Sequence, residues 1–184
     1  MRRHGSRAIR HSGRVRSSSS IAFCRRAQTM TIDKTVAEVR RRFSAAPEEV
    51  FAAFAEAELV GRWLKPAPEI KLAVLQFEFH VNGAYRFAYQ RQQGEIVIVG
   101  GAFLSIEQPA KIVFSWIIEP PDEHAGIESE VTVIITPDGA GSELVIRHEK
   151  LTRSDAIVRH AVGWRGALDQ LTALLEAQDL QHDR

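Results

Sequence analysis

The feature that most constrains the fold is a series of short alternating segments that leads into one long amphipathic segment. The short segments span residues 75–79, 85–89, 96–106, 112–118, 127–135 and 144–148. In the first, Leu75, Phe77 and Phe79 alternate with polar residues, as in a half-buried strand. Turns containing proline or glycine separate the segments. The pattern predicts a six-stranded antiparallel meander, with a two-residue hairpin turn at Asn82-Gly83.

The segment that follows the meander predicts one long helix. Its apolar residues recur at steps of three and four, and they are Ile157, Ala161, Trp164, Leu168, Leu171 and Leu175. Thr152 or Ser154 suits the position that caps the helix. A sheet of this many strands curls, and this helix is the element large enough to fill the concave side.

Three elements are predicted ahead of the meander. Residues 35–43 alternate as a seventh strand. Pro47 suits a first helical position, and a second short helix covers residues 58–63 before Pro66 ends it. The fold class is therefore α+β. We expect a single domain over residues 31–180, the usual size for one core.

Residues 1–30 have a different composition from the rest of the chain. Met1–Thr29 holds eight arginines and no acidic residue, with a serine run at Ser17–Ser20. We predict a disordered basic tail, since it lacks hydrophobic periodicity. Three interpretations stay open, namely an upstream start with Met30 as the natural initiator, a mitochondrial targeting segment, and a tail for anionic surfaces.

The charge of the domain itself is acidic. Subtracting the eight tail arginines from the 24 basic residues leaves 16 against 23 acidic residues, a net charge of −7 from Met30 onward. This balance argues against a nucleic-acid-binding body. No apolar run approaches the ~20 residues of a membrane span. We expect a soluble, cytoplasmic protein, or a mitochondrial one if the tail is a transit peptide, and either a monomer or a homodimer.

Motifs for catalysis, metals and cofactors are missing from the sequence. Cys24 is the lone cysteine and lies in the tail, so it forms no internal disulfide. The seven histidines show no metal-ligand spacing, and the chain has neither a phosphate loop nor a dinucleotide fingerprint. We therefore predict no cofactor and no metal.

Several local motifs resemble one known family. They are Ala46-Pro47-Glu48-Glu49-Val50-Phe51, Glu78 to Tyr85, Pro109 to Trp116, and His160-Ala161-Val162-Gly163-Trp164. With the element order, these motifs resemble the activator of heat-shock-protein ATPase homologue (AHSA-type) family of the SRPBCC, or START-like, superfamily. The resemblance covers Thr35 to Leu175 and implies a helix-grip fold, a curved seven-stranded sheet around the C-terminal helix. The chain departs from the family's Asp-x-Arg-x-Gly-Gly pattern at Glu78, His80 and Asn82.

A curled sheet and a helix cannot touch everywhere, so a cavity is expected between them. By alternation, strand residues should point toward the helix, helix residues should point back, and Trp63 should close one end. The candidate ligand-binding residues are Trp63, Phe87, Tyr89, Trp116, His148, Trp164 and Leu168. The alternative is that these side chains form plain core. His148 is the most notable titratable group, as a base beside Tyr89 or as a satisfied strand-end histidine.

Three functions follow as hypotheses. The first is a module that encloses a small hydrophobic or amphipathic ligand, as wider members of the superfamily do. The second, implied by the family, is co-regulation of a chaperone ATPase through the outer surface. The third is a small cyclase or dehydratase that uses His148.

Overall fold

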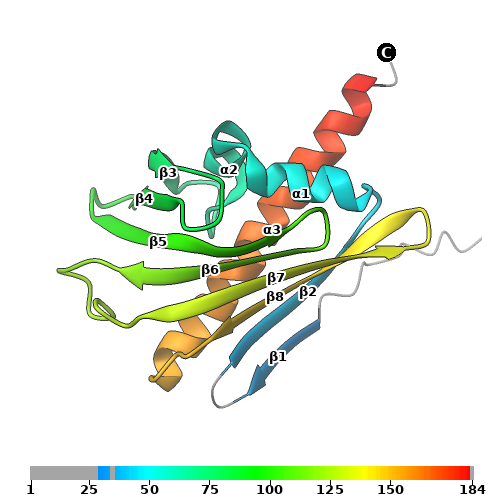
Figure 1. The fold of residues 1–184 in the computed structure, drawn as a ribbon. Coiled ribbons are helices and arrows are strands. Elements are labelled where there is room, and N and C mark those ends of the chain that lie inside the picture. The colour runs from blue at the N-terminus through cyan, green and yellow to red at the C-terminus, as the bar shows by residue number, and fades with distance from the viewer. Residues whose placement is uncertain (1–28, 34–35, 183–184) are drawn as a thin grey trace, which may run out of the picture.

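Figure 1 shows a computed structural model of the chain, and the structure describes residues 29–33 and 36–182. The predicted tail falls, up to residue 28, outside the described residues. The strands are β1 (Thr29–Asp33), β2 (Val36–Phe43), β3 (Lys71–Phe77), β4 (Ala84–Gln90), β5 (Ile96–Glu107), β6 (Lys111–Ile118), β7 (Ser129–Asp138) and β8 (Gly141–Glu149). The helices are α1 (Pro47–Ala55), α2 (Ala57–Trp63) and α3 (Ser154–His182).

All strands belong to one antiparallel sheet, in the order β1-β2-β8-β7-β6-β5-β4-β3. β2, the predicted first strand, pairs with β8, the last strand of the meander, so that Ala37 faces His148 across the ladder. The curved sheet, the two short helices and the long C-terminal helix confirm the predicted helix-grip fold. The sheet has one strand more than expected, because β1 pairs with the outer edge of β2. Strand β1 begins at Thr29, ahead of the predicted domain start at residue 31.

The connection between β3 and β4 differs from the prediction. Residues 78–83 separate the two strands, so the predicted two-residue hairpin turn is wrong. Asn82 does adopt the left-handed conformation expected of it, with φ 66°. Phe79 leaves the ladder and packs against Phe51 and Phe103, with ring centroids 5.9 and 4.9 Å away. This partly buried ring thus packs on the core outside the strand, in the connection that follows β3.

Helix α3 crosses one side of the sheet, while α1 and α2 lie at one end (Figure 1). All six residues of its predicted apolar stripe are buried. The backbone of α3 packs closely against β2, β8 and the short helices. Gly166 permits the contact after α2, because a Cβ there would lie 1.8 Å from the carbonyl oxygen of Pro66.

Aromatic side chains fill the interior near α1 and α2. This phenyl cluster consists of Phe77, Phe79, Tyr85, Phe87, Phe103 and Phe114, whose neighbouring rings lie 4.8 to 6.3 Å apart. A cavity of about 20 Å³ remains among them. The Tyr85 hydroxyl donates to the Ser115 carbonyl oxygen at 2.5 Å, so its polar atom is satisfied. This half of the interior is closely packed.

In the part of the chain that the structure describes, no helix is both long and apolar enough to cross a bilayer.

Candidate functional site

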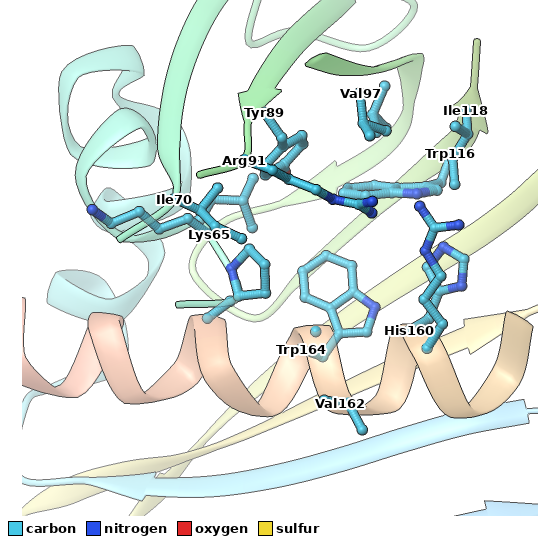
Figure 2. A pocket seen from close by; sticks show the side chains of 16 residues that line it. Lys65, Ile70, Tyr89, Arg91, Val97, Trp116, Ile118, His160, Val162 and Trp164 are labelled. Atoms are coloured by element: carbon cyan, nitrogen blue, oxygen red, sulfur yellow. The ribbon is translucent and has the colours of Figure 1, made fainter. Parts of the chain in front are cut away.

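A pocket of about 240 Å³ lies between strands β4 to β6 and helix α3 (Figure 2). Its apolar wall includes Leu64, Pro66, Ile70, Val97, Val99, Ile118 and Ala167. Two tryptophans pack against each other in its wall, Trp116 from β6 and Trp164 from α3, with ring centroids 5.2 Å apart. The backbone of α3 packs closely on β2 and β8, and the pocket lies where the helix faces β4 to β6.

Of the seven candidate residues, the structure places Tyr89, Trp116 and Trp164 in the pocket wall. The other four, Trp63, Phe87, His148 and Leu168, are buried behind it. Trp63 donates its Nε1–H to the carbonyl oxygen of Ala53 at 2.8 Å and packs on Phe54. Phe87 belongs to the phenyl cluster, and Leu168, which is part of α3, is fully buried. The sequence pattern predicted which face of the sheet or helix each residue lies on, but not whether its side chain reaches the pocket or is buried behind its wall.

His148 joins the two tryptophans through a chain of hydrogen bonds. Trp164 Nε1 lies 3.1 Å from His148 Nδ1, and an indole nitrogen only donates, so Nδ1 must accept. His148 Nε2 therefore carries the proton and donates to Ser129 Oγ at 2.8 Å. Ser129 Oγ then donates to the carbonyl oxygen of Trp116 at 2.8 Å. Each bond fixes the direction of the next, so His148 is held as a single neutral tautomer.

Burial reinforces this assignment. The His148 side chain has no exposed surface, and its burial, with the neighbouring His160, lowers its pKa well below the ordinary value. Both ring nitrogens are engaged. His148 thus holds the Trp164 ring in place by a hydrogen bond. It has no free nitrogen with which to act as a base on a pocket ligand.

His160 lines the pocket, although the sequence analysis did not include it among the candidates. Its ring lies 4.4 Å from that of His148 and 6.3 Å from that of Trp116. Nδ1 donates to the Ala156 carbonyl oxygen at 2.7 Å, which leaves Nε2 as the unprotonated nitrogen of the neutral ring. Burial lowers its pKa to about 4. Its position one helical turn before Trp164 was the signal that could have identified it.

Three cationic residues also line the pocket, namely Lys65, Arg91 and Arg159. Arg159 binds Asp122, in the connection between β6 and β7, through two hydrogen bonds of 2.8 and 2.9 Å. This contact, ahead of a smaller one from the His124 backbone, lowers the pKa of Asp122 to about 2. The Arg91 side chain pairs with Glu95 at 2.9 Å. The sequence pattern missed these residues because two lie in or next to loops and Arg159 flanks the apolar stripe.

Trp116 differs from the other two tryptophans in its polar atom. The side chain is 8% exposed, and its Nε1 is buried without a hydrogen bond to any described residue. An unmade hydrogen bond of this kind costs roughly 1–3 kcal/mol. The nitrogen therefore favours any group that brings it an acceptor.

Within residues 29–33 and 36–182, no group of three or more His, Cys, Asp or Glu side chains is arranged to hold a metal ion.

A curved antiparallel sheet closed by a long C-terminal helix, with two short helices after strand β2, defines a helix-grip domain of the SRPBCC, or START-like, class. Residues 44–176 match the family model described as activator of Hsp90 ATPase homolog 1-like protein. The chain belongs to this family, and the resemblance seen in its motifs is confirmed. Among curated proteins, none matches the sequence.

Solved structures show the same fold. A protein from Chromobacterium violaceum is 26% identical with a TM-score of 0.66, and the match covers 76% of this chain and 96% of that one. The AHSA1 protein from Silicibacter pomeroyi is 24% identical with a TM-score of 0.69, covering 78% and 99%. A protein from Arthrobacter aurescens is 20% identical with a TM-score of 0.71, covering 81% and 91%.

Proposed function

We propose that this chain binds a small hydrophobic or amphipathic molecule in the pocket between β4 to β6 and α3. The observation that carries the proposal is the mainly apolar pocket of about 240 Å³ whose wall includes Trp116 and Trp164. His148 fixes one wall of this pocket by a directed hydrogen bond from Trp164.

The size of the pocket limits the ligand. Ligand sites usually measure ~300–1,000 Å³, and this one lies just below that range, which suits a single ring or a short chain. Burial of ~250 Å² of apolar ligand surface at about 25 cal/mol/Å² provides roughly 6 kcal/mol. Ordering costs reduce this gain, so we expect affinities in the micromolar range.

Native mass spectrometry of the purified protein, with a denatured control, tests the proposal. We expect an added small-molecule mass that disappears on denaturation. Gly163 lines the pocket, and a Cβ there meets nothing within 4 Å, so Gly163→Leu should fill the cavity and abolish the added mass. Val158→Leu is the matched control, because Val158 is 49% exposed on the same helix.

Two outcomes of this experiment contradict ligand binding. One is the mass of the chain alone in both the wild type and Val158→Leu, together with no uptake of added hydrophobic probes. The other is an added mass that Gly163→Leu retains in full, because the molecule then lies outside the pocket.

The family description favours a second candidate, co-regulation of a chaperone ATPase through the outer surface. This function predicts that the protein changes the ATP turnover of an Hsp90-type chaperone, and that Gly163→Leu leaves the change intact. Unchanged turnover at saturating protein would exclude it. The cyclase or dehydratase hypothesis loses its proposed base, because His148 is enclosed and both of its nitrogens are bonded.

A further inference from the structure

We propose that the occupant of this pocket is a small amphipathic anion, an apolar body with one carboxylate, held by Arg91 and by the Nε1–H of Trp116. This inference rests on the proposed function and names the chemistry of its ligand.

The charged groups of the pocket wall carry one sign. They are Lys65, Arg91 and Arg159, and no carboxylate side chain is among the described lining residues. The carboxylates that pair with the two arginines, Glu95 and Asp122, lie outside the lining. A ligand in the pocket therefore meets guanidinium groups on an otherwise apolar wall, which favours an anionic head group.

Arg91 is the cation that a ligand can recruit. Its pair with Glu95 is open to solvent, with 42% and 55% of the two side chains exposed, and such pairs contribute only ~0–1 kcal/mol. In Figure 2 the Arg91 side chain extends over the pocket toward Trp116. Arg159 is fixed more firmly, since Asp122 holds both of its terminal nitrogens and is nearly buried.

Trp116 supplies an independent reason for an acceptor on the ligand. Its Nε1–H is buried without a partner among the described residues, whereas the Nε1–H of Trp164 is satisfied by His148. An indole nitrogen only donates. A carboxylate oxygen is a strong acceptor for it, and the bond removes the cost of the unpaired donor.

The remaining polar groups at this end are compatible with an anion. His160, Arg159 and the neighbouring His124 and Asp122 form one cluster at the start of α3, and the charge of Arg159 acts on His160. A bound carboxylate near the ring would favour protonated His160.

Isothermal titration with a matched pair of probes, 4-phenylbutanoate and 4-phenylbutanol, tests this inference on the full chain. We expect the carboxylate to bind roughly tenfold tighter than the alcohol, the effect of one charged hydrogen bond. Arg91→Gln should remove most of that difference and leave the alcohol unchanged. Arg86→Gln is the matched control, because Arg86, on β4, also forms a solvent-exposed ion pair, with Glu119, and does not line the pocket.

Trp116→Phe keeps an aromatic ring and removes the donor, so it should also weaken carboxylate binding about tenfold. Thermal midpoints of all variants establish that each is folded. Equal affinity for the two probes, or equal effects of Arg91→Gln and Arg86→Gln, overturns the anion inference while ligand binding stands. Failure of the wild type to bind either probe counts against ligand binding itself.

Discussion

The two halves of the interior are both packed with aromatic side chains, but they leave very different volumes unfilled. Under α1 and α2, the phenyl cluster fills the space between sheet and helices and leaves about 20 Å³. Toward the start of α3, Trp116 and Trp164 pack on each other, and a pocket of about 240 Å³ remains beside them. Both halves are aromatic, so hydrophobicity alone does not separate them.

The difference lies in how the rings are held. Five of the six rings in the cluster are phenylalanine rings without a polar atom, so close packing alone sets their positions, and Tyr85 adds one hydrogen bond to the Ser115 carbonyl oxygen. Trp164 is tied at one atom to His148, which is tied to Ser129 and the backbone of β6. A hydrogen-bonded ring cannot shift into the cavity without leaving buried polar groups unpaired. The chain of hydrogen bonds through His148 therefore holds Trp164 in the pocket wall.

The phenyl half should dominate stability. Phe103→Ala is expected to lower the free energy of unfolding by about 3–5 kcal/mol, because it empties a site that is fully packed. Its neighbour Leu104 is 45% exposed, so Leu104→Ala should cost about 0.5 kcal/mol or less. Urea unfolding of both variants measures the difference. A change in probe affinity of Phe103→Ala comparable to its change in stability would break the separation between the halves.

The tryptophan half should instead dominate the response to acid. Burial lowers the folded-state pKa of His160 from 6.5 to about 4, so between these values the unfolded chain binds a proton that the folded one does not. The contribution of neutral His160 to the free energy of unfolding is fully present above pH 6.5. It is lost as the pH drops toward 4, by roughly 3 kcal/mol at 1.36 kcal/mol per pKa unit. Asp122, with its pKa of about 2, adds a further loss below pH 4.

Urea unfolding at several pH values, with the variant His160→Gln, isolates this effect. The variant should have a smaller loss between pH 6.5 and 4, with the remainder carried by His148, whose pKa is also depressed. The same steep loss in the variant and the wild type would show that His160 is not the group that titrates.

Substitutions at two glycines of α3 should have smaller effects on stability, and they also distinguish the closely packed part of the interior from the pocket. Gly166→Ala should cost about 1–3 kcal/mol, because its Cβ would collide with the Pro66 carbonyl oxygen, where α3 is tightly packed. Gly163→Ala, three residues earlier, meets open space and should stabilise the helix by about 0.5–1 kcal/mol. Thermal unfolding measures both. Destabilisation by Gly163→Ala would mean that the pocket is narrower than the structure has it.

The fold was largely predictable because its signals are local and repeated. The alternation from β3 to β8 and the stripe from Ile157 to Leu175 identify the meander and the helix, and the stripe is buried as predicted. The β3–β4 connection was not predictable, because the burial of Phe79 depends on rings far away in the sequence.

The candidate site was predictable only in part. Alternation identified Tyr89, Trp116 and Trp164, which line the pocket, but it also selected His148, which lies behind Trp164. Arg91 and Arg159 were missed. Whether these two side chains line the pocket depends on the angle between α3 and the sheet. The spacing of apolar residues along one helix does not predict that angle.

The three indole groups of this chain have three different surroundings, and this gives the protein a built-in set of reporters. The Nε1–H of Trp63 is bonded to the backbone of α1, and that of Trp164 to His148. That of Trp116 is unbonded among the described residues, and the Trp116 side chain lines the pocket. In an amide-correlation NMR spectrum, each indole gives its own resonance. A shift of the Trp116 resonance thus reports binding in the pocket, and a shift of the Trp164 resonance reports a change in the protonation of His148. The Trp63 resonance serves as an internal reference in the same sample.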